Sequence, residues 1–351
     1  MTTETYDAVL ILSFGGTEKP DEVIPFLENV LRGRGVPHER MLEVAEHYYH
    51  FGGKSPINDQ NRALIAALTQ ELVQHGPRLP IYWGNRNWHP FLTETLRQMQ
   101  ADGIRHALAF TTSVFSSYSG CRQYLEDIER SRAEIGDGAP QIDKLRSFYN
   151  HPLFIEAEAD RVRAAIDRIP PERRAGAQLL FTAHSVPLAM AESSDYRAQL
   201  DESCRLVAEN LGINSWRLVY QSRSGPPGQP WLEPDVGDVL RETQPGTDII
   251  VVPIGFISDH MEVLFDLDTE ARAISEERRL LMVRAATVGV HPQFLAMIRE
   301  LIRERMGLCE ARAIGKFGPN HNVCPANCCP APPRRPSSAR SDSSPRAIAQ
   351  R

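Results

Sequence analysis

Two residues of this sequence, His184 and Glu262, have the chemistry of a pair that handles a metal ion or a proton. His184 ends an apolar run, just before Pro187 stops a strand and forces a turn. Near neutral pH an imidazole can accept a proton or bind a metal. Glu262 follows a second apolar run, and a carboxylate opposite an imidazole suits a transient divalent ion such as Fe²⁺. On position alone, His184 could equally be a hydrogen-bonded structural residue.

Two further acids follow Glu262 at helical spacing. Glu262, Asp266 and Glu270 lie at i, i+4 and i+8 in a helix that we expect to open after Ser258 or Asp259. Like charges at this spacing destabilise a helix, so the stripe needs either solvent or a cation. A solvated acidic face is the default interpretation of Asp266 and Glu270. Glu262 differs because it lies in the first turn, close to the end of the strand.

The cysteines form a second candidate site. The sequence contains six of them, Cys121, Cys204, Cys309, Cys324, Cys328 and Cys329. Structural disulfides are not expected in a cytosolic chain, and Cys204 fits a buried helical position. The spacing of Cys324, Cys328 and Cys329 favours a soft-metal or iron–sulfur site over unliganded thiols, with zinc a lesser alternative. Either Cys309 or Cys121 could supply a fourth ligand.

The elements that must position these residues are short buried strands alternating with helices. Continuous apolar runs of this length are typical of strands buried on both faces. The predicted strands are Ala8–Leu12, Leu79–Trp83, Ala107–Phe110, Gln178–Phe181, Arg217–Tyr220 and Ile249–Val252. Helical spacing of apolar residues predicts helices over Asn61–Gln74, Ile155–Ile169 and Pro292–Met306. The alternation predicts an α/β fold with a doubly wound parallel sheet.

The runs fall into two sets, which predicts two similar Rossmann-like halves with a cleft between them. We expect an N-terminal half over 1–150, a C-terminal half over 151–308, a cysteine-bearing segment over 309–329 and a disordered tail over 330–351. Ligands of such folds bind at the carboxyl ends of the strands. We therefore expect His184 and Glu262 to face each other across a gap wide enough for a flat macrocycle.

Composition excludes several classes of function. The chain has 351 residues, a formal charge of −6, 42% hydrophobic and 24% charged residues. The acidic balance argues against a general nucleic-acid binder. No apolar run approaches the roughly 20 residues of a membrane-spanning helix, and the polar N-terminus is not a signal peptide, so we expect a cytoplasmic protein. The segments around Gly15-Gly16 and Gly52-Gly53 lack the spacing of a P-loop, which argues against nucleotide binding.

Taken together, these motifs resemble the ferrochelatase family over residues 7 to about 305. The resemblance rests on Thr182-Ala183-His184-Ser185-Val186-Pro187, Gly255-Phe256-Ile257-Ser258-Asp259-His260-Met261-Glu262, Gly52-Gly53-Lys54-Ser55-Pro56 and Pro230-Trp231-Leu232-Glu233-Pro234-Asp235. The sequence is most similar to the soluble actinobacterial-type branch, through Pro25–Val30 and Tyr82–Trp88. The resemblance implies a lyase of haem biosynthesis that inserts Fe²⁺ into a porphyrin with loss of two pyrrole protons.

The resemblance also implies roles for individual residues. His184 would accept a pyrrole proton, Glu262 would hold or deliver iron, and Asp266 and Glu270 would extend a metal or proton path from solvent. Ser55 and Tyr124 would contact the propionates or the ring, and Tyr118 would touch the ring. Arg32, Arg34 and Arg86 are available charges for carboxylates. Phe14 stands where one branch of the family has a Tyr that reaches the metal, so that axial contact should be absent.

Some family members hold a [2Fe–2S] cluster with three C-terminal cysteines and a fourth elsewhere. Animal-type members place the fourth where this chain has Ala157, and actinobacterial-type members place it at Cys121. Other bacterial members group all four, as Cys309 to Cys329 would allow. We expect a cluster here, and a monomer.

The resemblance and the lack of an apolar lip favour coproporphyrin III as substrate, with protoporphyrin IX as runner-up. A non-catalytic tetrapyrrole or iron carrier and an iron–sulfur sensor are the alternatives.

Overall fold

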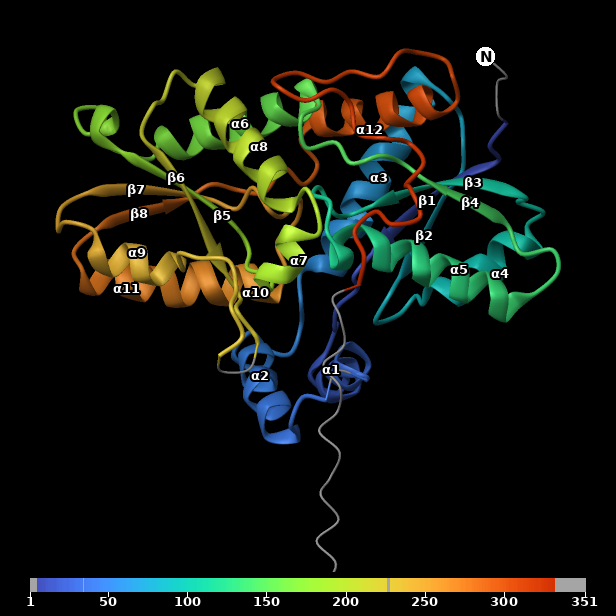
Figure 1. Ribbon diagram of the computed structural model, residues 1–351, viewed down its shortest axis with the longest axis horizontal. Coiled ribbons are helices and arrows are strands. Elements are labelled where there is room, and N and C mark those ends of the chain that lie inside the picture. The colour runs from blue at the N-terminus through green and yellow to red at the C-terminus, as the bar shows by residue number, and fades with distance from the viewer. Residues whose placement is uncertain (1–4, 34, 226–227, 332–351) are drawn as a thin grey trace, which may run out of the picture.

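The fold consists of two parallel four-stranded sheets, one for each half of the chain (Figure 1). The computed structural model describes residues 5–33, 35–225 and 228–331. The first sheet has the order β2-β1-β3-β4, with β1 (Ala8–Ser13), β2 (Ile81–Asn85), β3 (His106–Thr111) and β4 (Gln141–Lys144). The second has the order β6-β5-β7-β8, with β5 (Gln178–His184), β6 (Trp216–Gln221), β7 (Asp248–Val252) and β8 (Leu281–Arg284). The predicted α/β fold with two similar halves is confirmed.

The strands predicted from apolar runs are all present, and two edge strands were missed. Every residue of the inner strands β1 and β7 is buried, which is why their sequences are continuously apolar. β4 and β8 lie at the outer edge of their sheets and are only partly buried. An edge strand needs few apolar side chains, so the polar sequence of β4, Gln141-Ile142-Asp143-Lys144, did not stand out.

Helices cover both faces of the sheets (Figure 1). Their bounds are α1 (Val23–Leu31), α2 (His38–His50), α3 (Ile57–His75), α4 (Leu92–Ala101), α5 (Gln123–Ile135), α6 (Pro152–Ile166), α7 (Leu188–Glu192), α8 (Tyr196–Asn210), α9 (Val236–Glu242), α10 (Met261–Val263), α11 (Arg272–Glu277) and α12 (Pro292–Arg305). Shorter elements are the 3₁₀ turns η1 (Pro20–Glu22) and η3 (Arg174–Gly176) and the π-helices η2 (Tyr118–Arg122) and η4 (Leu264–Ala271). The three helices predicted from the sequence correspond to α3, α6 and α12.

The two helices that follow the edge strands begin in the same way. α6 begins with His151-Pro152 and α12 with His291-Pro292, and each histidine Nδ1 accepts a hydrogen bond, 3.3 Å long, from a backbone N–H of the first turn. Proline suits the first turn because its missing N–H would have no helical partner there. This shared start is a short internal repeat that the sequence analysis did not detect, and it matches the equal strand orders of the two sheets.

The C-terminal helix joins the two halves. α12 packs against α6 and also against α3 of the first half.

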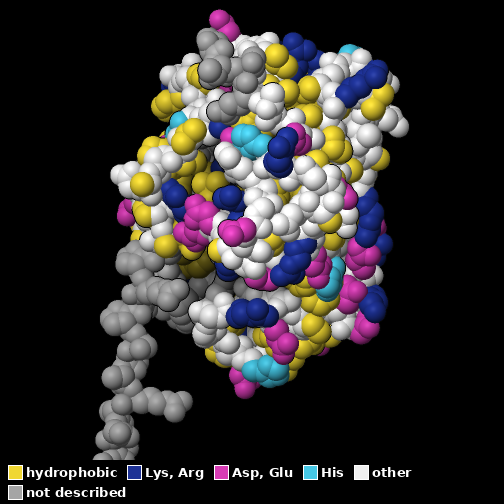
Figure 2. Space-filling view, turned by 90° about the vertical axis from the view of Figure 1, so that its right-hand side faces the viewer, with side chains coloured by type: hydrophobic (Ala, Val, Ile, Leu, Met, Phe, Trp, Pro, Cys, Tyr) yellow, Lys and Arg dark blue, Asp and Glu magenta, His cyan; other side chains and the backbone are white. Residues whose placement is uncertain are grey.

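Basic and acidic side chains are interspersed on the face that lies at the right of Figure 1, as Figure 2 shows. That face therefore offers no continuous basic surface for a nucleic acid. No helix among the described residues is long and apolar enough to cross a membrane.

Glu158, a buried acid inside α6, should make stability depend on pH. Burial raises its pKa from 4.5 to about 8, against the opposing effect of Arg161. Between these values the folded protein keeps a proton that the unfolded chain releases, so stability should fall as pH rises from about 5 to 8. Glu158→Gln cannot ionise and should gain a few kcal/mol over the parent at pH 8, at about 1.4 kcal/mol per pKa unit.

Urea unfolding of both proteins at pH 5 and pH 8 measures this difference. Glu156→Gln is the matched control, because Glu156 lies on the same helix with its side chain 41% exposed. Parallel pH dependences of the parent and Glu158→Gln would contradict the assignment.

Candidate active site

His184 and Glu262 contact each other at the carboxyl edge of the second sheet. The Nε2 of His184 lies 3.7 Å from Oε2 of Glu262, and the two side chains are 34% and 51% exposed. His184 is the last residue of β5, and its backbone carbonyl accepts a 2.9 Å hydrogen bond from Tyr196 Oη. Its Nδ1 pairs with the carbonyl oxygen of Ser185, so Nδ1 bears the hydrogen. Nε2 is thus the nitrogen directed toward the carboxylate.

This contact controls the charge on the imidazole. Burial alone would lower the pKa of His184, but the charge of Glu262 and its hydrogen bond outweigh burial, and the net result is a raised pKa. The Ser185 carbonyl and the more distant Asp266 act in the same direction. A divalent cation at this pair would replace the shared proton, because cations and protons compete for the same nitrogen and oxygen atoms.

The expected geometry of the pair is wrong in one respect. His184 and Glu262 were expected to face each other across a gap, but 3.7 Å leaves no room for a macrocycle between them. Both follow strands of the same sheet, β5 and β7, which are neighbours. The residues that lie opposite the pair come from the first half.

Residues of α2 and α3 form that opposing surface. The His47 ring stacks on Phe265 with ring centroids 3.6 Å apart. Gln60 Oε1 accepts a 2.9 Å hydrogen bond from the Asp259 backbone N–H. Burial, and then the nearby Glu262 charge, raises the pKa of Tyr48. The acid-bearing segment of the second half is thus in direct contact with the first half.

The acid-bearing segment is mostly a π-helix, where a regular α-helix was expected. Only Met261–Val263 is α-helical before the π-helix η4 begins at Leu264. Asp266 accepts hydrogen bonds from Ser222 Oγ and, at 3.3 Å, from Gln221 Nε2. Ser222 has φ 63°, a conformation that costs energy outside glycine and is often found at functional sites.

The three acids of the stripe have different environments. Burial, followed by the Glu262 charge, raises the pKa of Asp266 to about 7, so this carboxyl can exchange a proton near neutral pH. Burial also raises the pKa of Glu270, helped by Asp235. Glu270 lies near the far end of η4 and is exposed. Glu262 and Glu270 are thus exposed at the two ends of the segment, and Asp266 between them is half-buried.

The porphyrin contacts implied by the sequence are spread over the first half. Ser55 is 2% exposed, and a Cβ on Gly16 would lie 2.9 Å from the Ser55 Cβ, so only glycine fits beside it. Tyr118 begins η2 and donates a 2.9 Å hydrogen bond to Glu126. Phe14 packs edge-on against Phe26, at 6.3 Å between ring centroids.

The arginines expected to bind substrate carboxylates lie in different environments. Arg32 is exposed after α1 and bonds to Asn29, which leaves its charge accessible. Arg34 lies outside the described residues. Arg86 is an ion-pair partner of Asp127 with both side chains nearly buried, at 7% and 6% exposure. The prediction that Arg86 is a free charge for a substrate carboxylate is therefore wrong, because Asp127 already neutralises it.

Tyr124 lies directly beside this buried ion pair. Its ring is 4% exposed, and the Arg86 guanidinium lies 4.5 Å from the ring centroid. Little of the Tyr124 surface remains for contact with a ligand.

Comparison with known proteins shows the family of this chain. The family model "Ferrochelatase" matches residues 6–306. The chain belongs to the ferrochelatase family. It is 58% identical to the "Ferrochelatase" of Rhodopirellula baltica, over 94% of this chain and 95% of that protein. It is 50% identical to the "Coproporphyrin III ferrochelatase" of Streptomyces coelicolor, over 96% of this chain and 97% of that protein.

A solved structure shares the fold of this ferrochelatase-family chain. It is SirB from Bacillus subtilis with Fe³⁺, which superposes with a TM-score of 0.54 and 11% sequence identity. The match covers 86% of this chain and 96% of SirB. At this identity the likeness concerns the fold alone.

This ferrochelatase-family chain also brings four cysteines together. The neighbouring thiols of Cys324 and Cys329 lower the pKa of Cys121, and Cys121 raises the pKa of both. The Cys328 sulfur lies 3.6 Å from that of Cys329. Cys329 has φ 50°, a turn that lets adjacent cysteines direct their sulfurs to one place. Cys309 lies elsewhere, exposed, with its sulfur 3.7 Å from the carbonyl of Glu300.

Arg122 and His321 complete this group, and the sequence analysis missed both. The Arg122 guanidinium donates to the backbone carbonyls of Pro325 (2.7 Å), Ala326 (3.0 Å) and Cys328 (2.9 Å). His321 Nε2 lies 3.6 Å from the Cys328 sulfur. Cys121 and Arg122 are adjacent in η2, so this π-helix supplies both a sulfur and the group that holds the loop. No spacing rule links positions 122 and 325.

Proposed function

We propose that this protein inserts Fe²⁺ into coproporphyrin III, as a monomer in the cytoplasm. The observation that carries the proposal is the contact between His184 and Glu262, 3.7 Å apart beside a second acid, Asp266, with a pKa of about 7. The 50% identity to a protein named coproporphyrin III ferrochelatase supports this choice of porphyrin.

The proposed reaction exchanges two protons for one iron ion. Two pyrrole N–H bonds break, four Fe–N bonds result, and the two protons leave to solvent. His184 Nε2 accepts a pyrrole proton as general base. Glu262 holds the incoming Fe²⁺ through its carboxylate, which leaves Nε2 of His184 to take the proton. Asp266 and then Glu270 carry the released protons outward or the incoming iron inward.

The porphyrin is proposed to lie between this pair and the first half. Tyr118 borders it, Phe14 replaces an axial oxygen ligand with an apolar ring, and Arg32 pairs with a propionate. Bending the macrocycle exposes a nitrogen lone pair, and contacts remote from the nitrogens can supply that strain energy.

Anaerobic insertion assays with both porphyrins test the proposal. We expect turnover with coproporphyrin III and a clearly lower kcat/KM with protoporphyrin IX, because four carboxylates offer more partners for Arg32. Equal or better turnover on protoporphyrin IX would contradict the substrate. Binding of both porphyrins without metal insertion would favour the non-catalytic carrier.

We further propose that Cys121, Cys324, Cys328 and Cys329 hold a [2Fe–2S] cluster. The donor set fits, because the thiols of Cys324 and Cys329 act on the pKa of Cys121 and the Cys328 sulfur lies 3.6 Å from that of Cys329. Thiolate sulfur is the usual ligand of such clusters. When bound, a cluster would supply one-electron redox chemistry. No step of the insertion reaction depends on it. Arg122 orders the cysteine loop, and His321 is close enough to donate a hydrogen bond to the Cys328 sulfur.

A further inference from the structure

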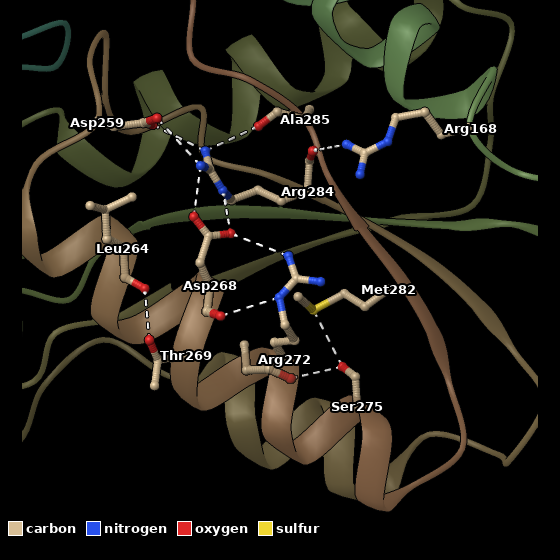
Figure 3. A network of polar contacts seen from close by, with 11 residues as sticks. Arg168, Asp259, Leu264, Asp268, Thr269, Arg272, Ser275, Met282, Arg284 and Ala285 are labelled. Carbon is tan, nitrogen blue, oxygen red and sulfur yellow. Dashed lines mark hydrogen bonds and ion pairs between the residues drawn. The ribbon is translucent and has the colours of Figure 1, made fainter. Parts of the chain in front are cut away.

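Arg284 lies beside the π-helix, between Asp259 and Asp268 (Figure 3). It is the last residue of β8, and its side chain is 14% exposed. Its Nε and one terminal nitrogen each lie 2.8 Å from an oxygen of the Asp268 carboxylate. The other terminal nitrogen lies 3.0 Å from Asp259 Oδ1. One guanidinium therefore joins two carboxylates of the same segment.

The two aspartates bracket Glu262 and Asp266 of the proposed mechanism. Asp259 precedes Glu262, and Asp268 follows Asp266 within the π-helix η4. A π-helix is a rare backbone form that rarely persists without specific contacts. From within the same chain segment, Arg272 donates a 3.2 Å hydrogen bond to the Asp268 backbone carbonyl and pairs with the Asp268 carboxylate at 3.6 Å. Arg284 differs because it fastens the segment to the sheet.

The backbone of Arg284 is itself held in place. Its carbonyl accepts a 3.3 Å hydrogen bond from Arg168, which follows α6. The far side of the acid-bearing segment is held by Gln60 and by the His47–Phe265 stack of the first half. The segment is thus fixed between the sheet and the first half, and Arg284 supplies the sheet side.

We propose that Arg284 is a positioning residue for iron transfer: by binding Asp259 and Asp268 together, it fixes the π-helix so that Glu262 and Asp266 stay directed at His184. This inference rests on the proposed function of those acids. The fork geometry matters as much as the charge, because a guanidinium can bind two carboxylates in a plane and an ammonium cannot. Arg284 itself contacts neither metal nor porphyrin.

Steady-state kinetics of Arg284→Gln, Arg284→Lys and Asp268→Asn test the proposal. We expect Arg284→Gln to raise the KM for Fe²⁺ about 10- to 100-fold, the usual range when a residue that orients metal ligands is lost. The KM for coproporphyrin III should change by no more than about twofold. Arg284→Lys should recover part of the loss, and Arg284→Gln with Asp268→Asn should be no worse than the poorer single variant.

Arg173→Gln is the matched control. Arg173 makes a two-point contact with Asp248 at the start of β7, with distances of 2.9 and 2.7 Å, at the other end of the same sheet. Its loss should lower stability without changing the KM for Fe²⁺. An effect that Arg173→Gln shares, or an unchanged KM for Fe²⁺ in a folded Arg284→Gln, would overturn the proposal.

Asp268→Asn covers the case in which Arg284→Gln does not fold. It keeps the shape of the side chain and removes one charge of the clamp, and an unchanged KM for Fe²⁺ in this variant would also overturn the proposal. Failure of the proposed function has a different outcome, since the parent protein would then insert no iron into any porphyrin.

Discussion

Replacing His184 by Ala should reduce kcat for iron insertion by about a hundredfold to ten-thousandfold, the usual contribution of a general base. Nε2 is directed at Glu262 because Nδ1 is occupied by the Ser185 carbonyl, so no other atom of this side chain can take the pyrrole proton. Porphyrin binding should persist, since the first half supplies the proposed propionate contacts. Loss of turnover with retained binding is the expected combination.

Anaerobic insertion rates and porphyrin fluorescence quenching measure the two quantities separately. His89→Ala is a suitable control because His89 also pairs with a glutamate, Glu94 at 3.4 Å, while its side chain is 62% exposed. The control should keep the parent rate. If His184→Ala retained a rate near that of the parent, or lost porphyrin binding to the same extent as turnover, His184 would not be the base.

The sequence predicted the parts of this fold that are buried on both sides. β1, with the sequence Ala8-Val9-Leu10-Ile11-Leu12-Ser13, is buried along its whole length. Burial on both faces requires apolar residues at successive positions, and that run can be recognised in the sequence. Edge strands vary: β2 and β6 also lie at sheet edges and were predicted, whereas the polar sequence of β4 gave no signal. The π-helix η4 could not be predicted either, because its residues have the same types and spacing as an α-helical stripe.

The candidate site was predicted better in its residues than in its geometry. His184 and Glu262 were identified, but their expected separation ignored that β5 and β7 are adjacent strands. Side chains at the ends of adjacent parallel strands meet; they do not face each other across a cleft between sheets. The buried pairing of Arg86 with Asp127 had no sequence signal, because it joins the end of β2 to α5 through tertiary packing alone.

The fourth thiol is the clearest case of information that only the fold supplies. Sequence spacing favoured Cys309 and Cys121 alike, because a loop can bring either residue to Cys324. In the structure η2 places Cys121 near Cys324 and Cys329. The Cys309 thiol instead lies 3.7 Å from the backbone carbonyl of Glu300.

Cys121→Ser should therefore abolish the [2Fe–2S] cluster, and Cys309→Ser should leave it intact. A serine hydroxyl at position 121 is a poor ligand for iron and cannot replace the thiolate whose pKa the neighbouring thiols lower. In protein purified anaerobically, the parent and Cys309→Ser should show visible charge-transfer absorption and equal amounts of iron and acid-labile sulfide. Cys121→Ser should show neither.

The two cysteine variants also distinguish the other occupants of this group. If the purified parent contained zinc and no labile sulfide, the group would hold a single metal ion and not a cluster. His321, Cys324 and Cys328 could ligate such an ion, because their ligand atoms lie within 4.8 Å of one another. Loss of the absorption in Cys309→Ser with retention in Cys121→Ser would contradict the ligand assignment. If Cys121→Ser lost the absorption but kept full insertion activity, the cluster would serve to hold the C-terminal segment against η2, through the loop that Arg122 orders.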